Sequence, residues 1–227
     1  MTIKKVLSVI ILLLFAVYSK SQINEKLQNF SKIEVFGKIN LRLEKSDTDS
    51  IFIKSGDFDI SKVSYEIKDS ILKIKLLSGF TSVNKVSITV KFKNILSIEA
   101  GGGCKMYNRG SINAETLLIK AKSGSELDLL INTDSVFVKV NKDAFVRLRG
   151  KNNYLKLRTA TGGDFRSTQM TNNTTIAVLN GGTAEVDITD LLDATVRYGA
   201  SFKFVKQPKK IKRKTQLGGK IGQLEEY

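Results

Sequence analysis

The sequence predicts an all-β protein, a β-helix or solenoid with a repeat of about 20 residues per coil behind an N-terminal region of antiparallel strands. Three observations support this fold class. Apolar residues alternate with polar ones along most of the chain, and from about residue 95 the pattern recurs at a fixed period. After the first 21 residues, no segment keeps a 3.6-residue apolar period for three turns, so we expect negligible helix there.

The composition excludes several kinds of active site. The 227 residues include 37 Lys and Arg against 22 Asp and Glu, a formal net charge of +15, and no histidine. No imidazole is therefore present to act as a general base, a metal ligand or a pH switch. Cys104 is the only cysteine, which rules out an internal disulfide and a zinc site built from several cysteines. We expect Cys104 to be a small buried residue; the alternative is a reactive or intermolecular thiol.

Residues 1–21 have the three-part plan of a secretory signal peptide. Lys4 and Lys5 precede an apolar run, and the small residues Ser19 and Ser21 precede the expected cleavage site. The alternative is a membrane anchor, but the apolar run is shorter than the roughly 18 to 20 residues that a spanning helix needs. We expect an exported protein that is periplasmic, associated with the outer membrane or extracellular, without a transmembrane anchor after cleavage. Cleavage would remove three lysines and no acid, leaving a net charge of +12.

Residues 22–94 are expected to form an N-terminal strand region that caps the coils. From Phe30 to Phe92 the apolar residues follow a period of two, which is typical of half-buried strands. Polar breaks separate these runs at hairpin-like spacing, at residues 46–50, 55–59, 68–70 and 78–84. We expect a small antiparallel sheet that is continuous with the coils.

Residues 95–205 contain the repeat that predicts the solenoid. One apolar position in each coil forms a core column: Ile98, Ile119, Val138, Leu157, Val178 and Val196. The positions two residues before this column and eight residues after it are also apolar in every coil. Six residues after it comes a mostly small column: Cys104, Ser125, Ala144, Gly163, Ala184 and Phe202. In a solenoid, each column stacks on the same column of the next coil.

Two other architectures share this spacing. A leucine-rich repeat has a similar period, but its L-x-x-L-x-L-x-x-N signature and its helical half-repeat are absent. An antiparallel sandwich whose hairpins recur near 20 residues remains the alternative to the β-helix.

Residues 206–227 are expected to form a basic C-terminal cap. The apolar pattern stops at Lys206, and six of the nine residues from Lys206 to Lys214 are cations. Further on, Ile221 and Leu224 allow one more short strand.

Four motifs, taken in chain order, carry a resemblance to a known family. They are Phe30-x-x-Ile33-x-Val35-x-Gly37, Lys73-Ile74-Lys75-Leu76, Ile98-x-Ala100-Gly101-Gly102-Gly103 and Ile119-x-Ala121-Lys122-Ser123-Gly124-Ser125. With them the chain resembles the head GIN domain family, described as auto-transporter adhesin heads typical of Bacteroidetes, over about residues 30 to 225. Later coils depart from the family's Ser-Gly-Ala turn. The resemblance implies an adhesion function and brings no catalytic residues.

Three local patterns suggest chemistry that their context does not support. Gly101-Gly102-Gly103 could cradle a phosphate, but no Gly-Lys-Ser/Thr and no helix follows it. Residues 181–187 partly match a calcium-binding nonapeptide but lack its Gly and Asp at the required places. Asp164, Glu185 and Asp187 could meet across coils as in polysaccharide hydrolases, yet solvated outward positions explain them equally well. We expect no catalytic residues, no cofactor and no metal.

The basic excess has a pattern of its own. One residue after the core column stands an outward column: Glu99, Lys120, Lys139, Arg158, Leu179 and Arg197. With coils stacked about 4.8 Å apart, its cations would form a ladder that contacts an anionic polymer through salt-sensitive interactions. The C-terminal cap offers further candidate contacts: Lys209, Lys210, Lys212, Arg213 and Lys214. The alternative is that all these cations only keep the solenoid soluble.

Residues 171–175, Thr-Asn-Asn-Thr-Thr, form a polar run at an expected coil corner. We expect its asparagines to stack between coils as a ladder; hydrogen bonding to sugars is the alternative.

Together these features predict a non-catalytic, exported surface or periplasmic binding module of adhesion type. Its expected partner is an anionic polysaccharide or another component of the cell envelope. Nucleic acid is not expected, because an exported chain without an aromatic stacking platform is poorly suited to it. Two alternatives remain open: a structural envelope protein without a specific ligand, and a polysaccharide lyase or hydrolase. The oligomeric state is not predicted.

Overall fold

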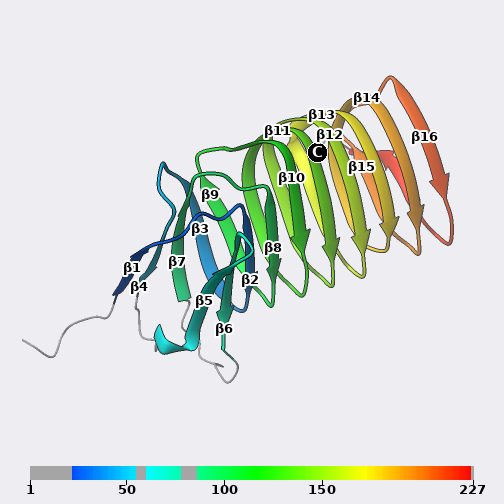
Figure 1. Ribbon diagram of the computed structural model, residues 1–227. Helices are drawn as coiled ribbons and strands as arrows, with labels where there is room; N and C mark the ends of the chain where they lie inside the picture. Colours follow the sequence, from blue (N-terminus) through cyan, green and yellow to red (C-terminus); the bar gives the residue numbers. More distant parts are fainter. Residues whose placement is uncertain (1–21, 55–59, 78–85, 226–227) are drawn as a thin grey trace, which may run out of the picture.

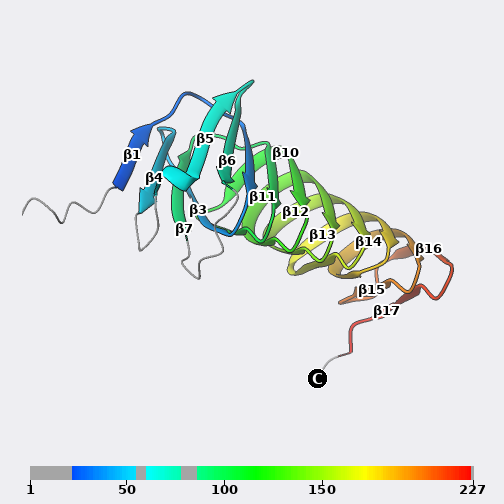
Figure 2. The same cartoon turned by 90° about the horizontal axis from the view of Figure 1, so that it is seen from below.

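The computed structural model describes residues 22–54, 60–77 and 86–225 and forms a β-solenoid of about 7 turns, with about 19 residues per turn. Its strands lie across a long rod, with the N-terminal strands at one end and β16 and β17 at the other (Figures 1 and 2). Within the described residues, helix is limited to a 3-10 turn at Ile60–Lys62. The predicted all-β solenoid is therefore confirmed. The expected signal peptide at 1–21 and the polar breaks at 55–59 and 78–84 lie outside the described residues.

The N-terminal region has seven strands, of which only some are antiparallel to their neighbours. They are β1 (Gln22–Lys26), β2 (Lys32–Phe36), β3 (Ile39–Lys45), β4 (Ser50–Lys54), β5 (Val63–Lys68), β6 (Ile71–Leu76) and β7 (Val86–Phe92). The pairs β1–β4, β4–β7 and β5–β6 are antiparallel, whereas β2 and β3 are parallel to all their partners and continue the solenoid. The sequence shows the period-two alternation but not the strand direction, because both arrangements bury alternate residues.

Ten strands make up the coils that follow, and every pairing among them is parallel. They are β8 (Ser97–Gly101), β9 (Lys105–Arg109), β10 (Ile112–Ala121), β11 (Glu126–Asn141), β12 (Phe145–Ala160), β13 (Asp164–Asn180), β14 (Thr183–Arg197), β15 (Ser201–Phe204), β16 (Lys210–Thr215) and β17 (Lys220–Gln223). Parallel pairing throughout excludes the antiparallel sandwich.

The solenoid has two sides, which we call face 1 and face 2. Face 1 contains β3, β9, the first halves of β11 to β14, β15 and β17, and face 2 contains β2, β8, most of β10, the second halves of β11 to β14, and β16. The turn from face 2 back to face 1 uses left-handed backbone, as at Lys142 (φ 51°) and Asp143 (φ 58°). Residues other than glycine are uncommon there, which explains why Gly or a short polar residue recurs in this turn.

The predicted core column is correct through four coils and then slips by one residue. Ile98, Ile119, Val138 and Leu157 pair in register, but Leu157 then pairs with Ala177 and not with Val178. The cause is a bulge between β12 and β13, which adds one residue to the later strand. A one-residue slip moves every side chain to the opposite face of the sheet. Val178 consequently points outward and is half-buried, and Leu179 enters the core.

The small column is longer and more regular than predicted. Its members in register are Cys104, Ser125, Ala144, Gly163, Gly182, Ala200 and Gly219. Ala184 and Phe202, which the sequence assigned to it, instead continue the apolar column of Phe165. The column is small because the chain passes close to the preceding turn: a Cβ atom at Gly163 would collide with the carbonyl oxygen of Val140.

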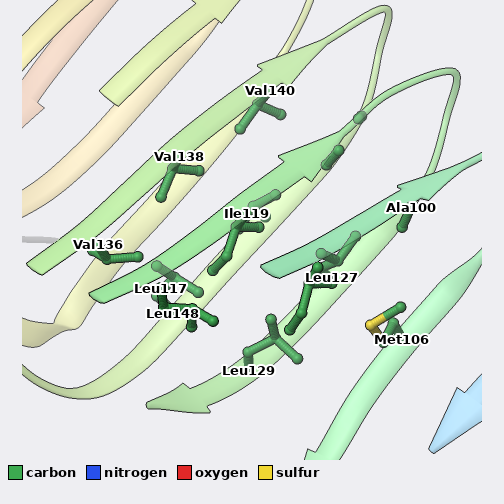
Figure 3. Packing of buried hydrophobic residues seen from close by; sticks show 14 of the residues in the cluster. Ala100, Met106, Leu117, Ile119, Leu127, Leu129, Val136, Val138, Val140 and Leu148 are labelled. Atoms are coloured by element: carbon green, nitrogen blue, oxygen red, sulfur yellow. The ribbon is translucent and has the colours of Figure 1, made fainter. Parts of the chain in front are cut away.

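Apolar side chains from both faces fill the interior as one continuous stack along the axis (Figure 3). Val136, Val138 and Val140 lie beside Leu117 and Ile119 of the previous coil, and all five are at most 3% exposed. Burying a side chain of this size stabilises the fold by about 1.5–3 kcal/mol, so stacked coils supply the stability that a disulfide would otherwise add.

Two parallel ladders of polar side chains run along the corner between the faces. In the buried ladder, Thr133 Oγ1 donates to Asn152 Oδ1 (3.0 Å), and Asn152 Nδ2 donates to Asn172 Oδ1 (2.8 Å). In the exposed ladder, Asn153 Nδ2 donates to Asp134 Oδ1 (3.2 Å) and Asn173 Nδ2 donates to Asn153 Oδ1 (3.3 Å). The predicted asparagine ladder is confirmed.

The basic C-terminal segment forms part of a further coil. Strand β16 pairs in parallel with β14, and β17, which contains the predicted Ile221, pairs with β15. In this pairing Ile211 lies beside Leu192, and Arg213 lies beside Ala194. Arg213 therefore occupies a position that is apolar in the preceding coils. Arg213 is exposed, because no later described strand covers it.

The buried ladder gives a first prediction. Replacing Asn152 with Ala leaves Thr133 and Asn172 without their shared partner in a buried site, so the free energy of unfolding should fall by about 2–3 kcal/mol. Asn153→Ala removes the neighbouring amide from the exposed ladder and should cost less than about 0.5 kcal/mol. Urea denaturation of both variants measures the difference, and equal losses would contradict the assigned role of burial.

Cys104 gives a second prediction. Its side chain is fully buried in the small column, and burial raises the pKa of its thiol to about 12. Because the thiolate is the reactive species, modification by a thiol reagent should be at least about a hundredfold slower in the folded protein than in urea. Rapid labelling under native conditions would favour the reactive-thiol alternative.

Candidate functional site

Face 2 brings three of the predicted cations together. Lys120 pairs in register with Lys139, and Lys139 pairs with Arg158, so the three side chains occupy the same outward position in three successive coils. All three are exposed. Strands in a sheet lie about 4.8 Å apart, which sets the spacing of the charged positions along the axis. We call Lys120, Lys139 and Arg158 the cation column.

The later members of the predicted column lie elsewhere. After Arg158 the same outward position is held by Val178, Thr195 and Lys214. Leu179 is in the core, and Arg197 pairs with Asn180 in a neighbouring column, where it is half-buried. The β12–β13 bulge moves Leu179 into the core, and further register shifts between β13 and β14 leave Arg197 two residues past Thr195, which holds the column position.

The C-terminal cations divide into three groups. Lys210, Lys212 and Lys214 point outward on face 2, and Lys214 lies in line with the cation column, two coils beyond Val178. Arg213 faces the end of the core. Lys209 forms an ion pair of 2.7 Å with Asp190.

An apolar column, which the sequence did not single out, runs beside the cations. Its positions lie two residues earlier on the same strands, where Leu118, Phe137, Lys156 and Ile176 pair in register. Leu118 is 42% exposed, and Lys156 Nζ lies 6.0 Å from the centre of the Phe137 ring. In the sequence, Leu118 and Phe137 are apolar residues at the same outward position of successive coils. A single exposed apolar residue is common on protein surfaces, so neither residue indicates a site when it is considered alone.

The two columns border a shallow depression of about 230 Å³. It is lined by Leu118, Phe137 and Lys156 on one side and by the cation column on the other, over Ile119 and Val138. Tyr154 stands next to it, its ring centre 6.2 Å from that of Phe137 and tilted by 57°.

Face 1 shows how the same fold balances its charges. In register along one outward column stand Asp128, Arg147, Arg166, Glu185 and Lys203. Arg147 and Arg149 both pair with Asp128, at 3.4 and 2.9 Å, and Arg166 pairs with Asp164 at 3.3 Å. Opposite charges in adjacent coils therefore compensate one another.

Face 2 lacks this balance around the depression. Only Lys120 has an acidic partner, Glu99 of the previous coil, at 3.4 Å, and Glu99 is bound more closely by Lys122 at 2.6 Å. Lys139, Lys156 and Arg158 have no ion pair with any described residue. The result is a patch of uncompensated positive charge next to the exposed Leu118 and the half-buried Phe137.

Glu99 closes one end of the cation column. Its burial raises the pKa of the carboxyl, but hydrogen bonds and charges from Lys122 and Lys120 outweigh this effect and leave the pKa below its usual value. Glu99 is therefore ionised at neutral pH and would repel an anion that extended past Lys120.

The other chemical candidates serve structural roles. Asp164 and Glu185 both form ion pairs with Arg166, at 3.3 and 3.8 Å. Gly102 and Gly103 form a left-handed turn, as their positive φ angles of 67° and 78° require. Across residues 22–54, 60–77 and 86–225, no three His, Cys, Asp or Glu side chains are grouped to hold a metal ion. The same residues include no helix with the length and hydrophobicity to span a membrane.

Comparison with known proteins identifies a family and a fold. Residues 29–208 match the family described as "Putative auto-transporter adhesin, head GIN domain". None of the curated proteins matches the chain. The resemblance that the coil motifs carry is thereby confirmed.

Several solved structures from Bacteroidetes have a similar fold. A "putative adhesin" of Bacteroides fragilis aligns with a TM-score of 0.82 and 20% identity, covering 91% of this chain and 98% of its own. One from Parabacteroides merdae has a TM-score of 0.75 and 17% identity, with coverage of 92% and 98%. A "putative lipid binding protein" of Parabacteroides distasonis has a TM-score of 0.68 and 14% identity, with coverage of 90% and 96%. Identities this low establish the fold alone.

Glu99 provides a prediction for the site. Glu99→Gln removes the ion pairs with Lys122 and Lys120 and should lower the free energy of unfolding by about 0.5–1 kcal/mol at pH 7. Because the pKa of Glu99 is lowered by folding, its contribution is complete above the unfolded-state pKa of about 4.3 and is lost as the pH falls through the folded-state value.

Urea denaturation of the wild type and the variant at pH 7 and at about pH 3 should therefore show a smaller difference at the lower pH. Glu126→Gln is the matched control. It removes the more exposed ion pair with Lys105 on face 1 and should have a smaller effect. A loss that is the same at both pH values would contradict the charge-based role of Glu99.

Proposed function

The chain belongs to the head GIN domain family of auto-transporter adhesins, and on this basis we propose that it is an exported, non-catalytic binding module whose face 2 holds an anionic polymer of the cell envelope. The partner class is an acidic polysaccharide or a similar envelope polyanion. The cation column is its primary contact, and Lys210, Lys212 and Lys214 extend the basic surface towards the C-terminal end.

The contrast between the two faces is the observation that carries this proposal. Like charges directly opposite one another on adjacent strands destabilise a sheet. On face 1 acidic neighbours remove that penalty, but Lys139 and Arg158 stack without any such neighbour. A requirement for solubility alone would be met equally well by cations distributed as on face 1.

A polyanion fits this arrangement physically. Each cation adds a weak contact, and the contacts act together because the coils hold them at a fixed spacing. Binding of this type weakens as salt concentration rises, since bound counter-ions are released.

The proposal of a non-catalytic role has its own support. The chain has no histidine, and the described carboxylates closest to a catalytic pair are neutralised by Arg166. Export is supported by the three-part pattern of residues 1–21 and by the adhesin description of the family.

Charge reversal tests the proposal. The double variant Lys139→Glu, Arg158→Glu should bind polygalacturonate about tenfold to a hundredfold more weakly at low salt, and wild-type binding should itself weaken as salt is added. The matched control is Lys151→Glu, Lys203→Glu, which changes the net charge equally at exposed positions outside face 2.

Elution from an immobilised polygalacturonate column along a salt gradient measures both variants, with thermal unfolding to confirm that they are folded. Equal losses in the two double variants would show a non-specific effect of net charge. Wild-type protein that is not retained would favour a structural envelope role, and release of shortened or unsaturated products would revive the lyase or hydrolase alternative.

A further inference from the structure

We infer that face 2 contains a three-residue subsite for a polyuronate, with the sugar chain lying along the solenoid axis and one acidic sugar over each of β10, β11 and β12. The inference rests on the proposed function and names its ligand class. Carboxylates would lie at the cation column and at Lys156, and sugar rings would lie over the depression between them.

The spacing of the two columns fits such a chain in both directions. Along a strand, residues two apart are about 6.6 Å from each other and point the same way, so Phe137 and Lys139 can contact the ring and the carboxylate of one sugar. Across strands, equivalent positions recur about every 4.8 Å. One residue of a 1,4-linked pyranose chain advances by a comparable length. Because successive sugars are turned about the chain axis, their carboxylates reach cations on both sides of the depression, the cation column on one side and Lys156 on the other.

The apolar side chains of the depression, the exposed Leu118 and the half-buried Phe137, favour a sugar over a simple polyanion. A polyphosphate or polyglutamate would use the cations but has nothing to cover Leu118 and the Phe137 ring. A pyranose presents a face of C–H groups that packs on such side chains, and an aromatic surface of this kind contributes beyond its buried area. The half-buried Tyr154 ring packs at a tilt against Phe137 and supports it from the side.

The third position uses Lys156 in place of an apolar residue. Its ammonium lies over Phe137, has no acidic partner among the described residues and is exposed, so its methylene stem can underlie the third ring while the charge reaches a carboxylate.

The ends of the site define its length. Before Lys120 the column holds Glu99, which is ionised and repels a fourth carboxylate, and after Arg158 it holds the uncharged Val178. Cations therefore serve three successive sugars and no more.

Titration calorimetry of the full chain with galacturonate oligomers, from the monomer to the hexamer, tests this length. Affinity should rise steeply up to the trimer and then change by less than about threefold, apart from the statistical gain from overlapping sites. Affinity that continues to rise in equal steps to the hexamer would overturn the three-residue subsite.

Poly-L-glutamate serves as the probe that has charge but no sugar ring. Phe137→Ala should weaken trimer binding about fivefold to tenfold and leave polyglutamate binding unchanged. Phe145→Ala is the matched control, because Phe145 is an outward aromatic on face 1 flanked by Arg147 and Arg166, both neutralised by acids. The Phe145→Ala variant should bind the trimer and polyglutamate with unchanged affinity.

The outcomes separate this inference from the proposed function. If Phe137→Ala weakens both ligands equally, or neither, the sugar subsite is wrong, while loss of both ligands in Lys139→Glu, Arg158→Glu still supports a polyanion site. If wild-type protein binds neither ligand, the proposed function fails as well.

Discussion

The in-register parallel stacking of coils is the constraint on which the rest of the molecule depends. Each coil donates backbone hydrogen bonds to the next, so a position in one coil always lies beside its equivalent in the neighbours. Whatever property a column has is thereby repeated along the axis. Apolar columns produce a continuous core, and a column of small residues lets the chain pass close to the preceding turn. A residue type that recurs at one position of each coil therefore forms a column along the solenoid axis.

The same repetition can make a polar column stabilise or destabilise the fold, depending on which side chains it contains. An amide both donates and accepts, so Asn152 satisfies its neighbours on each side and a buried ladder becomes possible. An ammonium or guanidinium group only donates, and stacked copies repel one another. Face 1 resolves this by pairing its cations with acidic neighbours. Face 2 does not around the depression, where the unbalanced column lies beside the exposed Leu118 and the half-buried Phe137.

Much of this could be predicted from the sequence, and the errors have a common origin. The period-two alternation and the 20-residue spacing were sufficient for the solenoid, the buried Cys104, the polar ladder and the first three cations of the column. The register after Leu157 was not predictable, because irregularities between β12 and β13 and between β13 and β14 shift the later positions and leave the local alternation intact. Arg197 was therefore placed in the wrong column. Phe137 was overlooked because its significance comes from Lys139 and Lys156 on the same surface, and pairing across coils is what brings them together.

Arg213 has a consequence for the solubility of the whole molecule. A rod of parallel strands ends in an unpaired edge, which is the surface on which cross-β assemblies grow by adding identical strands. By placing a charge at a position that is apolar in the preceding coils, the last coil makes the addition of another copy unfavourable. An exposed cation at a core position of β16 therefore works against end-to-end stacking of two copies over this strand.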